Sequence, residues 1–207
     1  MGVFVSSHSH LLPGLIGPYG FCSTVMPAQP SGWPNALNVQ YLDSSRYHCS
    51  VTPQIRAQII QGVRDRNPSQ QRRPHVLIRP ISNPSHPAVG QYGLFAAKKI
   101  PPQTHIIDYV GELHCDDRES NYDLSLYRSQ DGTNIGIDAS TMGNEARFIN
   151  DYRGIREKPN AVFVDGRTGS GELRMSVWSA SQTIKKGDEI LVSYGKGWWC
   201  ARQSSTL

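Results

Sequence analysis

The pattern of apolar and polar positions changes character near residue 75. Beyond that point, short apolar runs rich in Val, Ile and aromatic residues alternate with turns that contain Gly or Pro, which is typical of β-strands. The predicted strands are 76–78, 93–97, 106–110, 134–137, 161–164, 173–178 and 190–194. Because little helical periodicity separates these runs, the sequence predicts a mainly β fold rather than an α/β fold.

The first third of the chain shows a different pattern. Residues 1–50 are rich in Ser, Pro and Gly without a sustained period, which predicts a largely irregular region. Apolar residues then recur at helical spacing, so we expect a short amphipathic helix over 53–66 that packs its apolar stripe on the main domain. The expected organisation is an irregular region over 1–74, one domain over 75–199 and a short tail over 200–207.

Charge is distributed unevenly along the chain. The formal net charge is +4, which is mildly basic and unlike a protein that coats nucleic acid. Residues 56–79 hold six Arg against one acid, whereas residues 112–138 hold seven acids against two Arg. The acidic stretch has two interpretations: a surface that attracts a basic peptide, or an ordinary solvated loop and strand face.

Cysteine spacing and hydropathy exclude several classes of protein. The cysteines are scattered without a CxxC pair, so neither a zinc site nor a disulfide framework is expected, and reduced thiols in an intracellular protein are the simplest interpretation. No apolar window approaches the roughly 18 residues of a membrane span. The first residues lack the basic segment of a secretory signal.

Four short segments carry the candidate chemistry. They are Gln-Tyr-Gly-Leu-Phe-Ala at 91–96, Asp-Tyr-Val-Gly-Glu at 108–112, Gly-Asn-Glu-Ala-Arg-Phe-Ile-Asn-Asp at 143–151 and Gly-Asp-Glu-Ile-Leu-Val-Ser-Tyr-Gly at 187–195. Each segment alone is weak evidence, but in this order and at this spacing they resemble the motifs of the SET-domain family. The resemblance implies a β-clip-like fold of small sheets with a threaded, knot-like C-terminal segment.

The resemblance also implies an activity, the S-adenosylmethionine-dependent N-methylation of protein lysine. A free lysine has a pKa of about 10.4, so its amine must lose a proton before it attacks the sulfonium methyl group. An apolar channel beside a cation lowers that pKa by desolvation and like-charge repulsion, so a strong general base is not required. Alignment of the reacting atoms and preorganised oxygens would supply the rate.

The candidate catalytic residues follow from the motif matches. Tyr194 would place its hydroxyl near the transferred methyl group, and Tyr109 would line the lysine channel. Val192 occupies the position that tunes the number of methyl groups added, and its small side chain without a hydroxyl predicts multiple methylation.

The cofactor-binding residues are also assigned by resemblance. They are Gln91, Tyr92, Gly93, Tyr122, Arg147, Phe148, Asn150, Asp151 and Trp198. Asn150 is expected to contact the methionine end of the cofactor, and the backbone of Asp151 to face the adenine. Trp198 or Trp199 would stack on the adenine, or would instead anchor the C-terminus to the core. Tyr122 is a looser match, and a surface strand residue is its alternative.

The sequence departs from the family in three places. Gln91 stands where the family has its first Gly, although Gly90 comes one residue earlier. Asp151 and Tyr152 replace a His-Ser pair, and a longer polar loop follows them. The cysteine-rich flanking modules of many histone-modifying members are absent from this sequence, so we expect no structural zinc.

The substrate stays open. The first hypothesis is a nuclear enzyme whose partner is a protein with a target lysine, in a histone tail or another basic peptide. The second is methylation of a non-histone protein, which would also allow a cytoplasmic location. The third is an inactive SET-like binding or scaffold module, which Gln91 and Asp151 favour and Tyr194, Asn150 and Tyr109 oppose. Direct nucleic-acid binding through 56–79 is not expected, because no aromatic platform or reader motif accompanies it.

Overall fold

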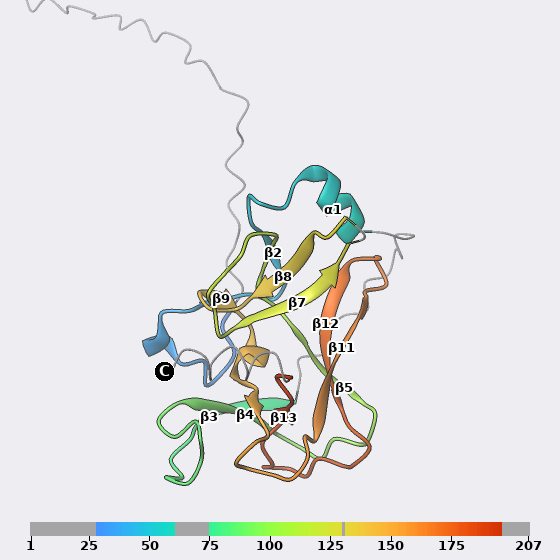
Figure 1. The fold of residues 1–207 in the computed structure, drawn as a ribbon. Helices are drawn as coiled ribbons and strands as arrows, with labels where there is room; N and C mark the ends of the chain where they lie inside the picture. Colours follow the sequence, from blue (N-terminus) through green and yellow to red (C-terminus); the bar gives the residue numbers. More distant parts are fainter. Residues whose placement is uncertain (1–27, 61–74, 130, 196–207) are drawn as a thin grey trace, which may run out of the picture.

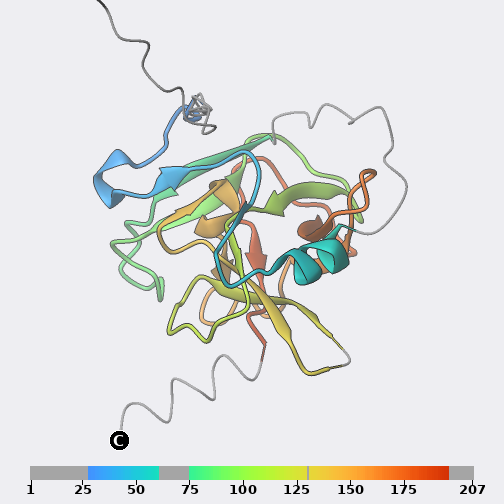
Figure 2. The same cartoon turned by 90° about the horizontal axis from the view of Figure 1, so that it is seen from above.

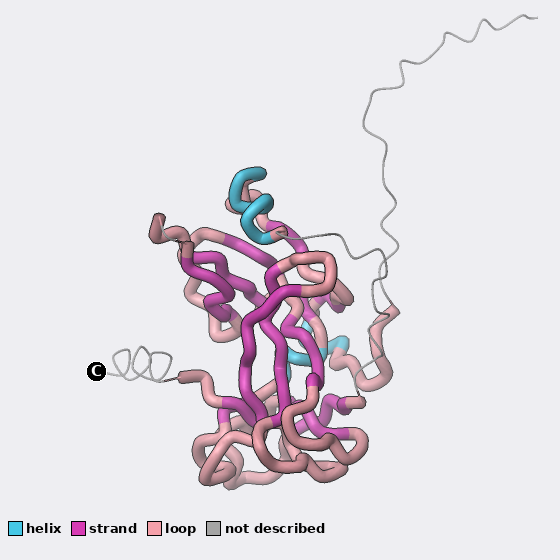
Figure 3. The backbone as a smooth tube through the Cα atoms, turned by 90° about the vertical axis from the view of Figure 1, so that its right-hand side faces the viewer, coloured by secondary structure: helices cyan, strands magenta, loops and turns pink. Residues whose placement is uncertain are grey.

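A computed structural model describes residues 28–60, 75–129 and 131–195, and most of the regular structure in this part of the chain is β (Figure 1). The strands are β1 (Gln40–Tyr41), β2 (Arg46–Tyr47), β3 (Val76–Pro80), β4 (Tyr92–Ala96), β5 (His105–Tyr109), β6 (Glu112–His114), β7 (Asp123–Arg128), β8 (Asn134–Asp138), β9 (Met142–Gly143), β10 (Asn150–Asp151), β11 (Ala161–Arg167), β12 (Leu173–Ser179) and β13 (Leu191–Val192). The helices are η1 (Asn35–Leu37), α1 (Pro53–Ile59) and η2 (Glu145–Phe148). Figure 3 shows how far strands outweigh helices.

The strands form small sheets, which confirms the mainly β prediction. The largest has the order β2-β6-β8-β7, a three-stranded sheet has the order β11-β12-β5, and the pairs β3-β4, β1-β9 and β10-β13 complete the set. All seven predicted strands overlap observed ones. The knot-like course of the C-terminal segment stays a prediction.

Two strands within the acidic stretch 112–138 were not predicted. The strands β6 and β7 pair with opposite edges of β8. Arg118 lies among three of the acids of this stretch, with nitrogen–oxygen distances of 2.9 Å to Glu112, 3.3 Å to Asp116 and 3.4 Å to Asp138. Part of the acidic charge is therefore balanced within the fold.

Residues 28–60 hold more regular structure than expected. The strand β1 pairs in parallel with β9, and β2 pairs in parallel with β6. Trp33 is buried and packs edge-to-face on Tyr41 and Phe148, with ring centroids 5.1 and 5.5 Å apart. These strands are only two residues long, so no periodicity could reveal them; tertiary pairing rather than local propensity forms them.

The predicted helix is present but short. Thr52 caps α1 through its hydroxyl, which accepts a hydrogen bond from the amide of Ile55 at 3.3 Å, and Pro53 occupies the first turn. Ile59 is fully buried, as expected of an apolar stripe that packs on the domain. The helix ends at Ile59, before residue 66, and Ile60 forms an antiparallel β-bridge with Glu172. Figure 2 shows the cyan helix near the orange strands. Residues 61–66 lie outside the described residues.

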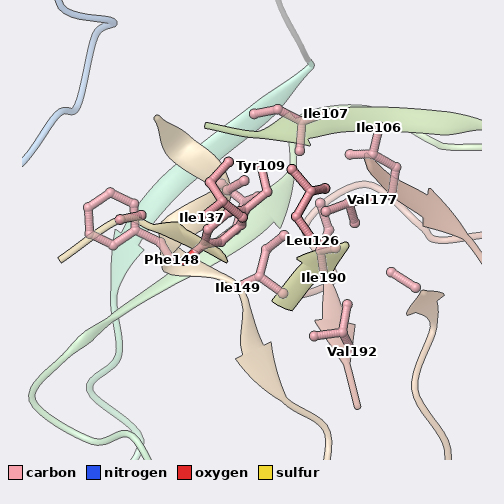
Figure 4. Packing of buried hydrophobic residues seen from close by; sticks show 14 of the residues in the cluster. Ile106, Ile107, Tyr109, Leu126, Ile137, Phe148, Ile149, Val177, Ile190 and Val192 are labelled. Atoms are coloured by element: carbon pink, nitrogen blue, oxygen red, sulfur yellow. The ribbon is translucent and has the colours of Figure 1, made fainter. Parts of the chain in front are cut away.

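The core contains side chains from the three-stranded sheet, the four-stranded sheet, β4, η2 and β13, and Figure 4 shows part of this packing. Ile107, Val177, Ile190 and Val192 are among its buried side chains. Within the described ranges no helix is long and apolar enough to cross a membrane.

Candidate functional site

A cavity of about 380 Å³ is the candidate site. Its walls come from the ends of β5, β7 and β11, from η2 and β10, and from the loop before β4. Nine of the twelve residues predicted from the motifs line it: Gln91, Tyr92, Tyr109, Tyr122, Arg147, Phe148, Asn150, Asp151 and Tyr194. Segments that are far apart in the sequence therefore meet in one place.

Two tyrosine hydroxyls in the cavity wall are held by backbone carbonyls. The hydroxyl of Tyr194 donates to the carbonyl oxygen of Ile149 at 2.7 Å, and that of Tyr109 donates to the carbonyl oxygen of Tyr122 at 2.8 Å. Burial raises the pKa of Tyr109 well above its usual value, and the neighbouring Tyr194 adds to the effect. Tyr109 therefore stays a neutral hydroxyl group at physiological pH and cannot act as a base.

Arg147 is a buried cation in the same wall. Its guanidinium carbon lies 4.3 Å from the ring centroid of Tyr122 and 4.9 Å from that of Phe148, and its Nε donates to the carbonyl oxygen of Ala139 at 2.9 Å. Aromatic faces and carbonyl dipoles stabilise the charge. The stacking also places Tyr122 in the cavity wall rather than on a surface strand.

Asn150 is fixed by a network that the motifs did not reveal. Its Nδ2 donates to Glu189 Oε1 at 2.9 Å and to the carbonyl oxygen of Tyr92 at 3.2 Å. The other carboxylate oxygen of Glu189 lies 2.9 Å from Nε2 of His86, and both of these side chains are buried. Because the amide of Ala88 donates to Nδ1 of His86 at 3.0 Å, the Nε2 atom carries the proton that bonds Glu189.

This network ties the loop before β4 to the cavity. His86 and Glu189 are 103 residues apart and join the loop to the strand that precedes Tyr194. The sequence offered only a lone His in a Ser- and Pro-rich loop, which is too common a feature to predict a role.

The glycine substitution noted at Gln91 has a structural explanation. Gly90, one residue earlier, has a φ of +82° and makes the tight turn, and its amide donates to the carbonyl oxygen of Ile81 at 2.9 Å. Gly93 is not part of the cavity wall. A Cβ at Gly93 would lie 2.6 Å from Glu189 Oε1, so this glycine makes room for the carboxylate that holds Asn150.

Asp151 stands where the family has His, and its buried carboxylate positions Tyr194. Its Oδ2 accepts hydrogen bonds from the amide of Tyr194 and from Nη1 of Arg153, both at 2.8 Å. Its Oδ1 accepts from the amide of Arg153 at 2.9 Å. The side chain thus orients the backbone at the proposed catalytic residue.

The two remaining predicted residues are Val192 and Trp198. Val192 is fully buried in the core opposite Asp151 and does not line the cavity (Figure 4). Trp198 lies outside the described residues, so its place over the cofactor stays a prediction.

Several apolar side chains in the cavity wall were missed. Among them are Leu124, Ile155 and Phe163, and the ring of Phe163 packs edge-on to Tyr109 with ring centroids 6.1 Å apart. They belong to no motif, and only strand alternation around Leu124 and Phe163 could have drawn attention to them. In the described ranges, no group of three or more His, Cys, Asp or Glu side chains could hold a metal ion. The wall therefore offers aromatic surface, a cation, an amide and neutral hydroxyls, which suits an organic ligand with a flat ring and polar ends.

Comparisons with known proteins found similar chains. The family model described as "SET domain" matches residues 91–195, about half of the chain. The histone-lysine N-methyltransferase EHMT1 of Homo sapiens is 32% identical over 114 residues, 52% of this chain and 8% of its own length. The inactive histone-lysine N-methyltransferase 2E of Mus musculus is 33% identical over 140 residues, 63% of this chain and 7% of its own length.

A solved structure shares the fold. The crystal structure of ATXR5 in complex with mono-methylated histone H3.1 matches with a TM-score of 0.56 and 18% identity, over 78% of this chain and 83% of that one. The chain spans less than a tenth of the length of the two methyltransferase relatives it matches.

Proposed function

Because the chain belongs to the SET-domain family, we propose that it is an S-adenosylmethionine-dependent protein lysine N-methyltransferase that acts on histone tails. The observation that carries the proposal is the single cavity that gathers Tyr109, Asn150 and Tyr194. A module that only binds a partner has no need for two fixed tyrosine hydroxyls and a buttressed amide in one small cavity.

The cavity wall fits the proposed cofactor. When bound, S-adenosylmethionine supplies an activated methyl group on a cationic sulfur. Asn150 and the backbone of Gln91 and Tyr92 would hold its amino-acid end, and the backbone of Asp151 would face its adenine. The volume of about 380 Å³ lies within the range of small-molecule sites.

The protein's own groups would prepare the lysine. Tyr109 and Tyr194 each donate their hydroxyl proton to a carbonyl oxygen, and a hydroxyl oxygen that donates in this way can also accept a hydrogen bond from the lysine amine. Leu124, Ile155 and Phe163 make part of the wall apolar, which favours the neutral amine over the ammonium ion. Neutral amine held in line by two hydroxyls would need no general base.

The proposed substrate is a histone tail in the nucleus. The relatives named above carry histone-lysine methyltransferase names, and the structural neighbour was solved with a histone H3.1 partner. The addition of more than one methyl group, expected from the small Val192, stays a prediction, because Val192 does not line the cavity.

A second candidate, an inactive SET-like binding module, has one specific observation in its favour. The relative aligned over 140 residues is named as inactive. The buried carboxylate of Asp151 weakens this alternative, because the residue that alters the family motif accepts a hydrogen bond from the backbone amide of Tyr194.

Methyl transfer tests the proposal directly. The purified protein would be incubated with S-adenosylmethionine and core histones, and the histones analysed by mass spectrometry for added methyl groups on lysine. We expect methylation by the wild type and by Tyr127→Phe, an exposed tyrosine in β7, but not by Tyr194→Phe. Methylation of other proteins in a cell extract but never of histones would replace the histone assignment, and cofactor binding without transfer to any protein would favour the inactive module.

A further inference from the structure

Four lysines from two distant segments form a cluster outside the cavity. Lys98 and Lys99 follow β4, and Lys185 and Lys186 precede β13; all four side chains are exposed. In the sequence they are two isolated dipeptides that carry little information. The fold makes one basic surface of them, which we call the lysine cluster.

Backbone hydrogen bonds on both sides hold the lysine cluster together. Ile100 and Ile184 exchange amide–carbonyl bonds of 2.9 and 3.0 Å at one end. At the other end Ala96 bonds Asp188 at 2.9 Å and Gly187 at 2.8 Å. Only residues 97–99 and 185–187 lie between these contacts, and paired segments run about 5 Å apart, so the four charges share a small area.

The lysine cluster carries more positive charge than the carboxylates near it can balance. The carboxylate of Asp188 accepts a hydrogen bond from the backbone amide of Lys185 at 3.1 Å, and Glu189 is buried against His86 and Asn150. Among the described residues no carboxylate forms an ion pair with any of the four lysines. The flanking residues 101–104 and 181–183 are uncharged. Like charges on paired segments repel one another, so this arrangement costs stability unless an anion binds it.

We propose that the lysine cluster binds the phosphate backbone of double-stranded DNA. Lysine contacts phosphate as a flexible point charge, whereas reading bases calls for the planar fork of arginine or a side-chain amide. Residues 97–104 and 181–188 contain no aromatic side chain on which unpaired bases could stack. The surface therefore fits a duplex contact that is independent of base sequence.

The choice of partner rests on the proposed function, because a histone substrate is presented on wrapped DNA. No direct nucleic-acid contact was expected from the sequence, where the arginine-rich stretch over 56–79 was the candidate. The lysine cluster is a different surface, which forms only when the chain folds.

Salt dependence gives the expected size of the effect. Up to four phosphate contacts predict that the logarithm of the binding constant falls with the logarithm of salt concentration with a slope of about −3.6. Between 50 and 200 mM salt, this slope corresponds to a roughly 150-fold loss of affinity.

The test is binding of a fluorescent 30-base-pair duplex to the full chain, followed by polarisation across that salt range. The variant carries Lys98→Gln, Lys99→Gln, Lys185→Gln and Lys186→Gln. The control carries Arg46→Gln, Arg128→Gln, Arg156→Gln and Lys158→Gln, which removes the same charge from exposed positions elsewhere. We expect the variant to bind the duplex at least tenfold more weakly than the wild type, and its affinity to change little with salt concentration. The control should keep a salt slope near the wild-type value.

Several results would overturn the proposal: wild-type protein that does not bind duplex at 50 mM salt, a variant that binds like the control, or a polyglutamate peptide or single strand that binds as tightly as duplex. Relief of repulsion predicts that the variant's melting temperature is no lower than that of the wild type, which guards against a folding defect. The assay contains no cofactor or histone, so it succeeds or fails separately from the proposed methyl transfer.

Discussion

Replacing Asp151 by Asn tests how the chain compensates for its altered motif. The buried carboxylate accepts hydrogen bonds from two backbone amides, Tyr194 on Oδ2 and Arg153 on Oδ1. An asparagine side chain has one oxygen and one NH₂ group, so it can accept from only one of these amides. The other amide then faces a donor whichever way the side chain turns.

The expected cost follows from that count. A buried amide without an acceptor costs about 1–3 kcal/mol. The ion pair with Arg153 adds little, because the Arg153 side chain is 36% exposed and solvent screens the charge. For a chain of this size the loss corresponds to a fall in melting temperature of about 2–12 °C. The rate of methyl transfer should also fall, because the backbone amide of Tyr194 loses its hydrogen bond to the Asp151 carboxylate.

Urea unfolding monitored by circular dichroism measures the free energy of unfolding, and Asp165→Asn is the matched control because Asp165 is exposed on β11. We expect the control to stay within about 0.5 kcal/mol of the wild type. If Asp151→Asn also stays within that range and keeps its activity, then the carboxylate does not position Tyr194.

Three further predictions address the surroundings of the cavity. Gly93→Ala should lower the free energy of unfolding by about 1–3 kcal/mol and weaken cofactor binding, because its Cβ would lie 2.6 Å from Glu189 Oε1. The control Gly166→Ala, whose Cβ would have no atom within 4 Å, should change neither quantity. Thermal unfolding measures the stability and calorimetry measures the cofactor binding. His86→Ala should weaken cofactor binding about tenfold, since a lost hydrogen bond of roughly 1.4 kcal/mol to Glu189 is a factor of ten, and an unchanged dissociation constant would count against the network. Although burial alone would raise the pKa of Asp108, hydrogen bonds from His105 and Ser176 and the charge of Arg174 hold it below its usual value. That contribution to stability is full above the unfolded-state pKa of about 3.9 and is lost as pH falls through the lower folded-state value, so urea unfolding of Asp108→Asn should depend less on pH below 4 than that of the wild type.

The strands that sequence predicted best are those whose side chains alternate over several residues. In β11 and β12, Phe163 and Val177 face each other across the pair, and the runs around them are long enough to show a period of two. The parallel strands β10 and β13 are two residues long and pair Asp151 with Val192, which no local pattern can reveal. The same limit hid the pairing of β1 and β2 with the main domain.

Some residues of the candidate site could be predicted from the sequence and others could not. Tyr109, Asn150 and Tyr194 could be assigned because each belongs to a recognisable motif. His86 could not be assigned, because its significance comes from Glu189, which only the fold brings within 2.9 Å of it. Gly93 was predicted to bind the cofactor and lies next to the cavity residue Tyr92. Its lack of a side chain makes room for the carboxylate of Glu189 rather than for a ligand.

Calorimetric titration of S-adenosylmethionine into the purified protein tests the central claim most directly. We predict that the wild type, Tyr194→Phe and the control Asn134→Ala on β8 bind the cofactor with similar affinity, whereas Asn150→Ala binds at least tenfold more weakly. Absence of binding to the wild type, or equal binding by Asn150→Ala, would contradict the assignment of this cavity as the cofactor site.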